Sequence, residues 1–265
     1  MTGVARATVI ITGASMGIGR ALALEWGRRG ATTILSARGK EALDGVAVEV
    51  SEAGGLPIVV PGDVTNETHR QELIGQAVTS GRLDVLCNNA GRGFYSPVLK
   101  IDLDQMRELF ELNVYAPLRL AQLATPLLEA SRGTVVMMSS VAGMVAAPRY
   151  GAYAASKFAL EALSMAMRAE IAERGVRVVV IRPGPVATPF RANATRAEGE
   201  AGYSAPDPDA QSAESVARLT VRAVEKGSPV VETSAFVRFA GAAARLAPPG
   251  LRMALRRMAK KPPTP

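Results

Sequence analysis

The sequence predicts an α/β domain in which helices cover both faces of a parallel β-sheet. Short β-branched runs alternate along the chain with stretches of helical periodicity, as they do in repeated strand–helix–strand units. With 265 residues, 48% of them hydrophobic, the chain can bury one large core. Neither a sequence repeat nor a linker interrupts it before residue 185, so we expect a single domain there.

The elements can be placed from the apolar runs and the glycines between them. Leu22 and Trp26 have the four-residue spacing of a buried helix face, and Gly54-Gly55 ends the second helix. We expect strands at residues 7–12, 32–37, 57–60, 83–88, 134–139, 176–182 and 229–232. We expect helices at 18–29, 40–53, 67–80, 102–130 and 151–174.

A glycine-rich turn joins the first predicted strand to the first predicted helix. It reads Thr12-Gly13-Ala14-Ser15-Met16-Gly17-Ile18-Gly19. Glycines permit a tight turn and a close approach of the backbone to a pyrophosphate, whose charge is favoured at a helix N-terminus. The turn therefore predicts a dinucleotide site, although a glycine-rich turn without a ligand has the same composition.

The residues after the second predicted strand indicate which dinucleotide binds. Folds of this type usually carry an acid there that holds the adenosine ribose 2′-hydroxyl. This chain has Ser36-Ala37-Arg38 instead. An acid would repel a 2′-phosphate, whereas a guanidinium can bind it through two charge-assisted hydrogen bonds. The sequence therefore predicts NADP(H) rather than NAD(H).

Tyr153 and Lys157 lie four residues apart in a predicted helix, so their side chains share one face. A phenol with a pKa near ~10 is a poor acid–base catalyst at neutral pH, and an adjacent ammonium would lower that pKa. Ser140 lies thirteen residues upstream, at the end of an apolar run, where its hydroxyl could bind a carbonyl oxygen together with Tyr153. A surface pair at the same spacing is the alternative interpretation.

Six motifs in this order and spacing resemble those of the classical short-chain dehydrogenase/reductase family, over about residues 7–232. They are Thr12 to Gly19, Asn88-Asn89-Ala90-Gly91, Asn113, Ser140, Tyr153 with Lys157, and Pro183-Gly184-Pro185-Val186-Ala187-Thr188. The resemblance implies a single-domain Rossmann fold, doubly wound, with seven parallel strands. It also implies hydride transfer between a nicotinamide and a carbonyl or alcohol.

The resemblance assigns catalytic roles to four residues. Tyr153 would act as the general acid or base, and Lys157 would lower its pKa and bind the nicotinamide ribose. Ser140 would orient the carbonyl, since Ser139 does not have the family's offset to the tyrosine. Asn113 would hold a water of the proton relay.

The resemblance also implies a set of cofactor-binding residues. Asp63 and Val64 would flank the adenine, Asn89 to Gly91 would pass behind the ribose, and Val186 and Thr188 would hold the carboxamide. Met16 stands where many NADP-preferring members have a second basic residue, so the cofactor prediction rests on Arg38. The full set is Gly13, Ser15, Met16, Gly17, Ile18, Gly19, Arg38, Asp63, Val64, Asn89, Ala90, Gly91, Tyr153, Lys157, Pro183, Gly184, Val186 and Thr188.

The segment 186–210, within a domain spanning 1–233, resembles the family's mobile substrate lid. Expected pocket residues are Phe94, Tyr95, Met144, Val145 and Phe190, which suit a hydrophobic carbonyl compound such as a 3-oxoacyl chain, a steroid or a xenobiotic ketone. Ordinary packing under the lid would explain them equally. A dehydratase or epimerase and a non-catalytic NADP- or lipid-binding protein are the other function classes. Family members of this type suggest a homodimer or homotetramer.

Composition narrows the remaining possibilities. One Cys and one His exclude a Cys/His zinc site, and we expect no metal. Cys87 lies in an apolar run and is predicted to fill the core, whereas His69 comes after a turn and is expected at the surface. We expect neither a secretory signal nor a membrane span. The single cysteine excludes a disulfide framework and suits a cytoplasmic protein.

The excess positive charge lies in the C-terminal extension, residues 234–265. Seven of the 31 basic residues and none of the 24 acids fall there, so the rest of the chain is neutral, which argues against nucleic-acid binding. We expect a helix at 235–246 whose apolar side carries Phe236, Phe239, Ala243 and Leu246. We expect a second helix at 251–260 with an apolar stripe of Leu251, Ala254, Leu255 and Met258. The basic residues Arg252, Arg256 and Lys260 lie away from that stripe. This extension either contacts an anionic membrane peripherally or packs on the body or another subunit.

Overall fold

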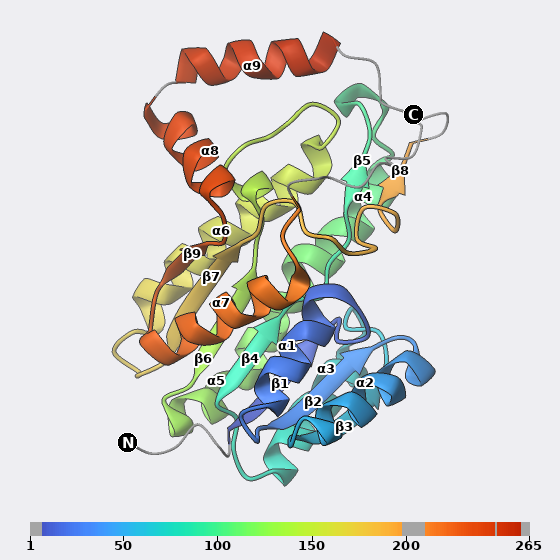
Figure 1. Ribbon diagram of the computed structural model, residues 1–265, viewed down its shortest axis with the longest axis vertical. Coiled ribbons are helices and arrows are strands. Elements are labelled where there is room, and N and C mark those ends of the chain that lie inside the picture. The colour runs from blue at the N-terminus through green and yellow to red at the C-terminus, as the bar shows by residue number, and fades with distance from the viewer. Residues whose placement is uncertain (1–6, 198–209, 247, 261–265) are drawn as a thin grey trace.

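The computed structural model describes residues 7–197, 210–246 and 248–260 and contains the predicted doubly wound sheet. Seven strands, all parallel, lie in the order β3-β2-β1-β4-β6-β7-β9 (Figure 1). Their bounds are β1 Thr8–Thr12, β2 Thr32–Ala37, β3 Leu56–Pro61, β4 Val85–Asn88, β6 Thr134–Met138, β7 Arg177–Arg182 and β9 Val230–Glu232. The chain order reverses between β1 and β4, and ligands of open α/β sheets bind at such a reversal.

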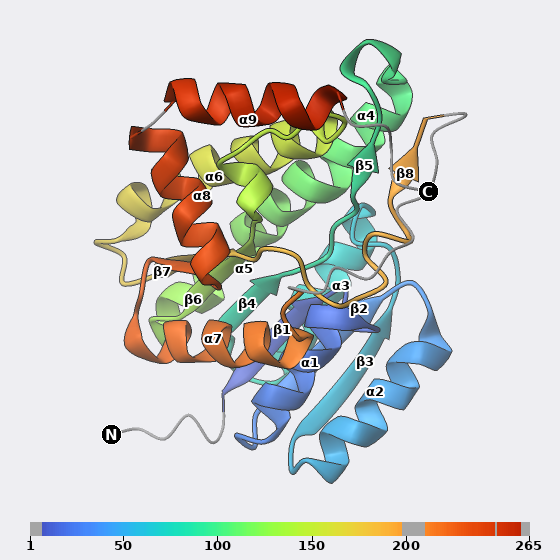
Figure 2. The same ribbon diagram turned by 45° about the horizontal axis from the view of Figure 1, so that its top comes forward.

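Helices cover both faces of the sheet (Figure 2). On one face α1 (Gly17–Gly27), α2 (Lys40–Glu52) and α7 (Ala213–Lys226) bury apolar side chains in a shared core. On the other face α3 (Glu67–Thr79), α5 (Ala116–Ser131) and α6 (Gly151–Ile171) form a second core. The two cores lie on opposite sides of the alternating strand residues, which is why the strands read as nearly continuous apolar runs.

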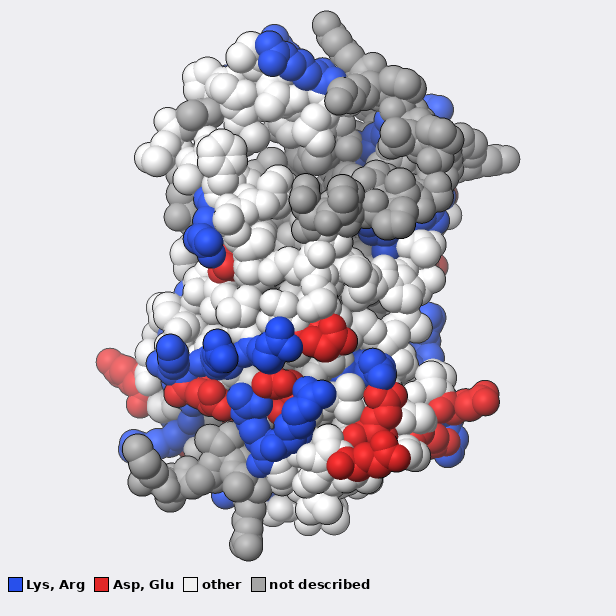
Figure 3. All heavy atoms as spheres, in the orientation of Figure 1, with Lys and Arg blue, Asp and Glu red and all other residues white. Residues whose placement is uncertain are grey.

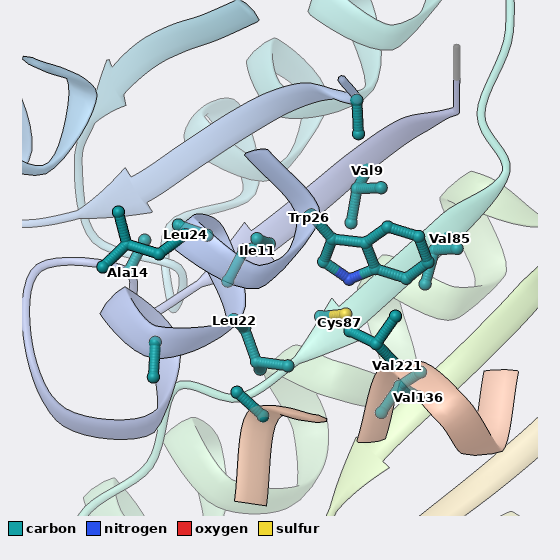
Figure 4. Packing of buried hydrophobic residues seen from close by; sticks show 14 of the residues in the cluster. Val9, Ile11, Ala14, Leu22, Leu24, Trp26, Val85, Cys87, Val136 and Val221 are labelled. Carbon is teal, nitrogen blue, oxygen red and sulfur yellow. The ribbon is translucent and has the colours of Figure 1, made fainter. Parts of the chain in front are cut away.

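Trp26 of α1 is a large buried side chain in the core that α1 and α7 form on β1 and β4 (Figure 4). Its buried indole lies beside Cys87, which confirms the prediction that Cys87 fills the core. Burial raises the pKa of the Cys87 thiol to about 12, so the thiol stays protonated and unreactive.

Three parts of the fold differ from the sequence expectation. The segment expected as one helix at 102–130 consists of α4 (Leu103–Phe110), a π-helical turn (η3, Glu111–Tyr115) and α5. Helix α7 was not expected, although Ser212 caps it and Val216, Val221 and Val224 have helical spacing. A short parallel pair, β5 (Phe94–Tyr95) with β8 (Thr195–Arg196), was also missed.

The C-terminal extension forms two helices at one end of the molecule, α8 (Ala235–Leu246) and α9 (Pro248–Lys260) (Figure 1). The prolines expected to separate the helices instead begin α9, where a missing N–H costs nothing. Among the described helices, none has the length and apolar composition to cross a membrane.

The core beneath α1 offers a test of the packing. We expect Leu22→Ala to lower the free energy of unfolding by about 2–5 kcal/mol, because Leu22 is fully buried and its loss leaves a cavity. Val48→Ala, at an exposed position of α2, is the matched control and should change it by less than about 0.5 kcal/mol. Urea unfolding of both variants measures the difference, and equal values would contradict the described packing.

Candidate functional site

The glycine-rich turn after β1 is closed so tightly that its glycine positions exclude side chains. Gly13 and Gly17 adopt left-handed φ angles of 66° and 55°, which glycine permits without strain. A Cβ placed on Gly19 would lie 2.0 Å from the carbonyl oxygen of Gly13 and 2.6 Å from Nδ2 of Asn89. Helix α1 therefore begins directly against the turn, with its first N–H groups available to an anion.

Asn89 and Thr12 fasten this turn to the end of β4. The Asn89 amide donates to the carbonyl oxygens of Thr12 and Gly13, at 2.9 and 3.2 Å. The Thr12 hydroxyl accepts from the backbone N–H groups of Asn89 and Ala90, both at 3.0 Å. These bonds hold two predicted cofactor segments, residues 12–19 and 89–91, side by side at the strand-order reversal.

A second group of predicted residues lies at the ends of β2 and β3. Arg38 and Asp63 lie at least partly in solvent, and Val64 beside them is buried. Burial acts to raise the pKa of Asp63, but hydrogen bonds from Thr65 and the positive charge of Arg38 outweigh it and hold that pKa below its usual value. Arg38 is thus close enough to act on the Asp63 carboxylate and remains open to solvent.

His69 is buried, and the prediction that it lies at the surface is wrong. Its Nε2 lies 2.8 Å from the Ser36 hydroxyl at the end of β2, and its ring packs so closely on Gly62 that a Cβ there would lie 2.3 Å from Nδ1. The ring therefore joins the ends of β2 and β3, which carry Arg38 and Asp63. Sequence reasoning missed it because Asn66 caps α3 and makes the start of the helix look like a surface turn.

Tyr153 and Ser140 meet in a small apolar cluster at the start of α6. Ser140 lies just after β6 and caps the short 3-10 turn η4 (Val141–Gly143), accepting from the N–H of Ala142 at 3.1 Å. Burial raises the pKa of Tyr153 to about 12, and the hydrogen bond with Ser140 opposes that rise. The structure therefore brings the predicted phenol and hydroxyl together, with the phenol protonated at neutral pH.

Lys157 lies beside Tyr153, as its spacing predicts, with Nζ 5.8 Å from the centre of the phenol ring. Its ammonium donates to the carbonyl oxygen of Met138 at 2.8 Å. Burial lowers the pKa of Lys157 to about 8. The expectation that Lys157 depresses the pKa of Tyr153 is not met in this structure, because the ammonium is directed at the backbone and desolvation dominates both groups.

Asn113 lies in the π-helical turn and is buried. Its side-chain amide donates to the carbonyl oxygen of Arg92 at 3.0 Å and to the Ser156 hydroxyl at 3.1 Å, and its oxygen accepts from the N–H of Arg92 at 2.9 Å. A Cβ on Gly91 would lie 3.2 Å from the Asn113 side-chain oxygen and 3.7 Å from Nζ of Lys157. Gly91, Asn113 and Lys157 are therefore neighbours.

The segment after β7 closes the opposite side of the site. The Pro183 carbonyl accepts from the N–H of Val141 at 2.8 Å, and Val186 forms a bridge with Gln211. The Thr188 methyl lies where a Cβ on Gly17 would be only 3.1 Å away. The remaining predicted cofactor residues lie either in the glycine-rich turn or in this segment. Ser15, Met16 and Ile18 belong to the turn, and Gly184 follows β7.

Some of the expected pocket residues surround Tyr153. The Phe190 ring lies 5.7 Å from the Tyr153 ring, and Tyr95 stacks edge-on against Tyr150 at 5.3 Å. Phe94 is fully buried, and Met144 contacts Gly241 of α8 rather than a free space. Residues 198–209 of the predicted lid lie outside the described residues.

The arrangement can bind a dinucleotide and transfer a proton. No three His, Cys, Asp or Glu side chains lie together as a metal site in the described part of the chain. The carboxyl edge of the sheet carries both groups of site residues, which therefore lie on one side of the molecule. The first group is the cofactor segments, namely the glycine turn, Asn89 and Arg38, and the second is Tyr153 with Lys157.

The comparisons with known proteins agree with this geometry. The family profile described as short chain dehydrogenase matches residues 7–199. The short-chain dehydrogenase ptmH of Penicillium ochrochloron is 41% identical over 187 residues, which cover 69% of this chain and 67% of that protein.

Two solved structures share most of the fold. A short-chain dehydrogenase from Sphingobium yanoikuyae in complex with NADPH superposes with a TM-score of 0.79 at 26% identity and covers 95% of each chain. An alcohol dehydrogenase from the archaeon Thermococcus sibiricus, complexed with 5-hydroxy-NADP, gives a TM-score of 0.75 at 26% identity, over 86% of this chain and 94% of that one.

The buried ammonium of Lys157 predicts a stability cost that depends on pH. Because its folded pKa lies near 8, below the ordinary 10.5, the wild type gains stability as pH rises from 8 to 10.5. Lys157→Met does not titrate but also loses the bond to the Met138 carbonyl, so we expect any advantage of the variant over the wild type to be largest at pH 7 and to shrink by about 2 kcal/mol by pH 9.5. Urea unfolding at the two pH values tests this, and an advantage that does not change with pH would contradict it.

Proposed function

The chain belongs to the short-chain dehydrogenase family and is an oxidoreductase of that family, and we propose that it transfers hydride between NADP(H) and a hydrophobic carbonyl compound or secondary alcohol. The observation that carries this proposal is the meeting of Ser140, Tyr153 and Lys157 at the carboxyl edge of the sheet, beside a glycine turn that excludes side chains. NADP(H) would supply or accept the hydride.

The residues present fit such a cofactor. The start of α1 and the side-chain-free surface of Gly13, Gly17 and Gly19 suit a pyrophosphate, and Asn89 to Gly91 would line the ribose. Arg38 would bind the 2′-phosphate, because its guanidinium is exposed at the end of β2 and Ala37 places no acid there. Val186 and Thr188 would hold the carboxamide.

Tyr153 would donate the proton to the carbonyl oxygen during reduction and remove it during oxidation. A pKa near 12 without ligands keeps the phenol protonated, as a general acid requires, and the bond from Ser140 opposes its rise. Ser140 would orient the carbonyl, and Lys157 would supply a positive charge near the phenol. Asn113, neighbouring both Gly91 and Lys157, would hold a water that returns the proton to solvent.

The substrate would be apolar around its carbonyl. Phe190 covers Tyr153, and Tyr95 and Tyr150 present a further aromatic surface nearby. We propose a homodimer or homotetramer as the assembly. An open groove of about 630 Å³ along α4 and η3 supports this assignment because it exposes the apolar side chain of Leu103 and the ring of Tyr115. It is lined by Leu103, Met106, Arg107, Glu108, Phe110, Glu111 and Tyr115.

Tyr153→Phe tests the proton transfer. The ring still packs in the variant but cannot donate, so turnover of an activated ketone with NADPH should fall at least ~100-fold while cofactor binding is retained. NADPH absorbance gives the rate, and fluorescence titration gives the affinity. Tyr115→Phe removes an exposed phenol from η3 and should keep the wild-type rate.

Two outcomes would contradict the catalytic assignment. The first is a Tyr153→Phe rate above about a tenth of the wild-type rate. The second is a wild type that turns over none of a broad panel of ketones, which would favour the non-catalytic alternative.

Arg38→Ala tests the choice of cofactor. We expect the variant to lose about 1–3 kcal/mol of NADPH binding, the range for a hydrogen bond to a charged group, with NADH almost unaffected. Ala37→Asp should shift the preference toward NADH by repelling the 2′-phosphate. Arg222→Ala, at an exposed site on α7, is the control. Equal kcat/KM values of the wild type for both cofactors would refute the NADP assignment.

A further inference from the structure

Helix α8 turns its apolar face away from the protein. It contacts the body through the fully buried Val237, through Gly241, where a Cβ would meet Met144 at 3.1 Å, and through the edge of the Phe236 ring, which a Cβ on Gly184 would meet at 3.5 Å. Phe239 and Leu246, on the opposite side, are 73% and 84% exposed, and Phe236, at the edge of this face, is 56% exposed. Large apolar side chains that stay exposed together on one helix face cost free energy in water and mark an interaction surface.

Helix α9 adds positive charge to the same end of the molecule. Its inward side carries the half-buried Leu251 and Leu255, while Arg252, Arg256 and Arg257 are exposed. The apolar stripe, expected either to contact a membrane or to pack on the body or another subunit, therefore faces partly inward, and the arginines lie on the outer side. Exposed Met253 lies beside Arg257, whereas Met258 belongs to the stripe of Leu251 and Leu255 and is also exposed.

The described residues of α8 and α9 include no acid that would balance these arginines. In Figure 3 the surface over α9 and the upper part of α8 is white and blue, whereas blue and red are mixed over the lower half of this face. The apolar face of α8 (Phe236, Phe239 and Leu246) and the exposed arginines of the two helices, Arg238 of α8 and Arg252, Arg256 and Arg257 of α9, together form the surface that we call the C-terminal surface.

We propose that the C-terminal surface binds an anionic lipid bilayer, with the phenyl rings of α8 at the level of the acyl boundary and the arginines on the headgroups. Aromatic rings flanked by basic side chains match the amphipathic character of such an interface. A second copy of the chain fits less well, because a two-fold contact between C-terminal surfaces would bring arginines together with no acid from the described part of either surface. The proposal does not depend on the catalytic assignment.

Co-sedimentation of the full-length protein with phosphatidylcholine vesicles, with and without about one third phosphatidylglycerol, tests the proposal. We expect binding to the anionic vesicles at low salt, and little to the neutral vesicles or at about 0.5 M salt, because the charge term is screened. Phe239→Ser/Leu246→Ser should weaken binding at least about tenfold by removing the apolar area that the bilayer would bury. Val48→Ser/Val78→Ser, exposed positions on α2 and α3, should leave it unchanged.

A charge-matched pair separates a specific surface from general basicity. Arg252→Gln/Arg256→Gln should weaken binding to anionic vesicles about 25-fold, since each arginine near such a surface contributes roughly fivefold. Arg218→Gln/Arg222→Gln removes two exposed arginines with the same spacing from α7 and should have little effect.

Three results would overturn the proposal. Protein that stays in the supernatant with anionic vesicles at low salt has no such surface. Equal losses for the two arginine pairs would mean that only net charge is sensed. An assembly that falls apart in Phe239→Ser/Leu246→Ser during analytical ultracentrifugation, without a loss of vesicle binding, would assign the surface to contacts between copies.

Discussion

The contact between Gly19 and the carbonyl of Gly13 is the constraint on which the rest of the site depends. A Cβ on residue 19 would lie only 2.0 Å from that oxygen, so this position has room for glycine alone, and α1 starts directly against β1. Asn89 completes the arrangement by bonding to both Thr12 and Gly13 from the end of β4. One closed turn thus fixes the first helix, two central strands and the segment 89–91 relative to one another, and the catalytic residues are positioned from the neighbouring strand β6.

Residue patterns predicted the strands, the glycine turn and the pairing of Tyr153 with Lys157, because each depends on local spacing, and the family resemblance selected Ser140. They did not predict the burial of His69, which depends on a contact with Ser36 thirty-three residues away in the chain. They also missed α7, whose position after a long polar segment obscured its helical spacing. The prediction that the pKa of Tyr153 is lowered was wrong for a similar reason. Residue spacing shows that a charge lies nearby but does not show how far burial removes the phenol from water.

The two ionisable groups of the site are both pushed toward their neutral forms by burial. Tyr153 is kept neutral, and protonation of Lys157 costs folding free energy at neutral pH. Such a cost is common where a protein keeps reactive groups apart from water, and it lowers overall stability. The large cores on both faces of the sheet, which include Trp26 and the packed residues of α5 and α6, offset this local cost.

The π-helical turn at Glu111–Tyr115 divides one continuous helical segment into two rotational phases. One additional residue in a helical turn rotates the rest of the helix by about 100°, because an α-helix has 3.6 residues per turn. Helix α5 can therefore direct Leu120, Ala124 and Leu128 at the sheet while α4 buries Leu109 against a different neighbour. Asn113 sits where the two phases change. Insertions and deletions of one residue should therefore have different structural effects along this segment. Within α4 or α5 they would misalign a buried face. A deletion within the turn would straighten the helix and turn Asn113 away from Gly91 and Lys157.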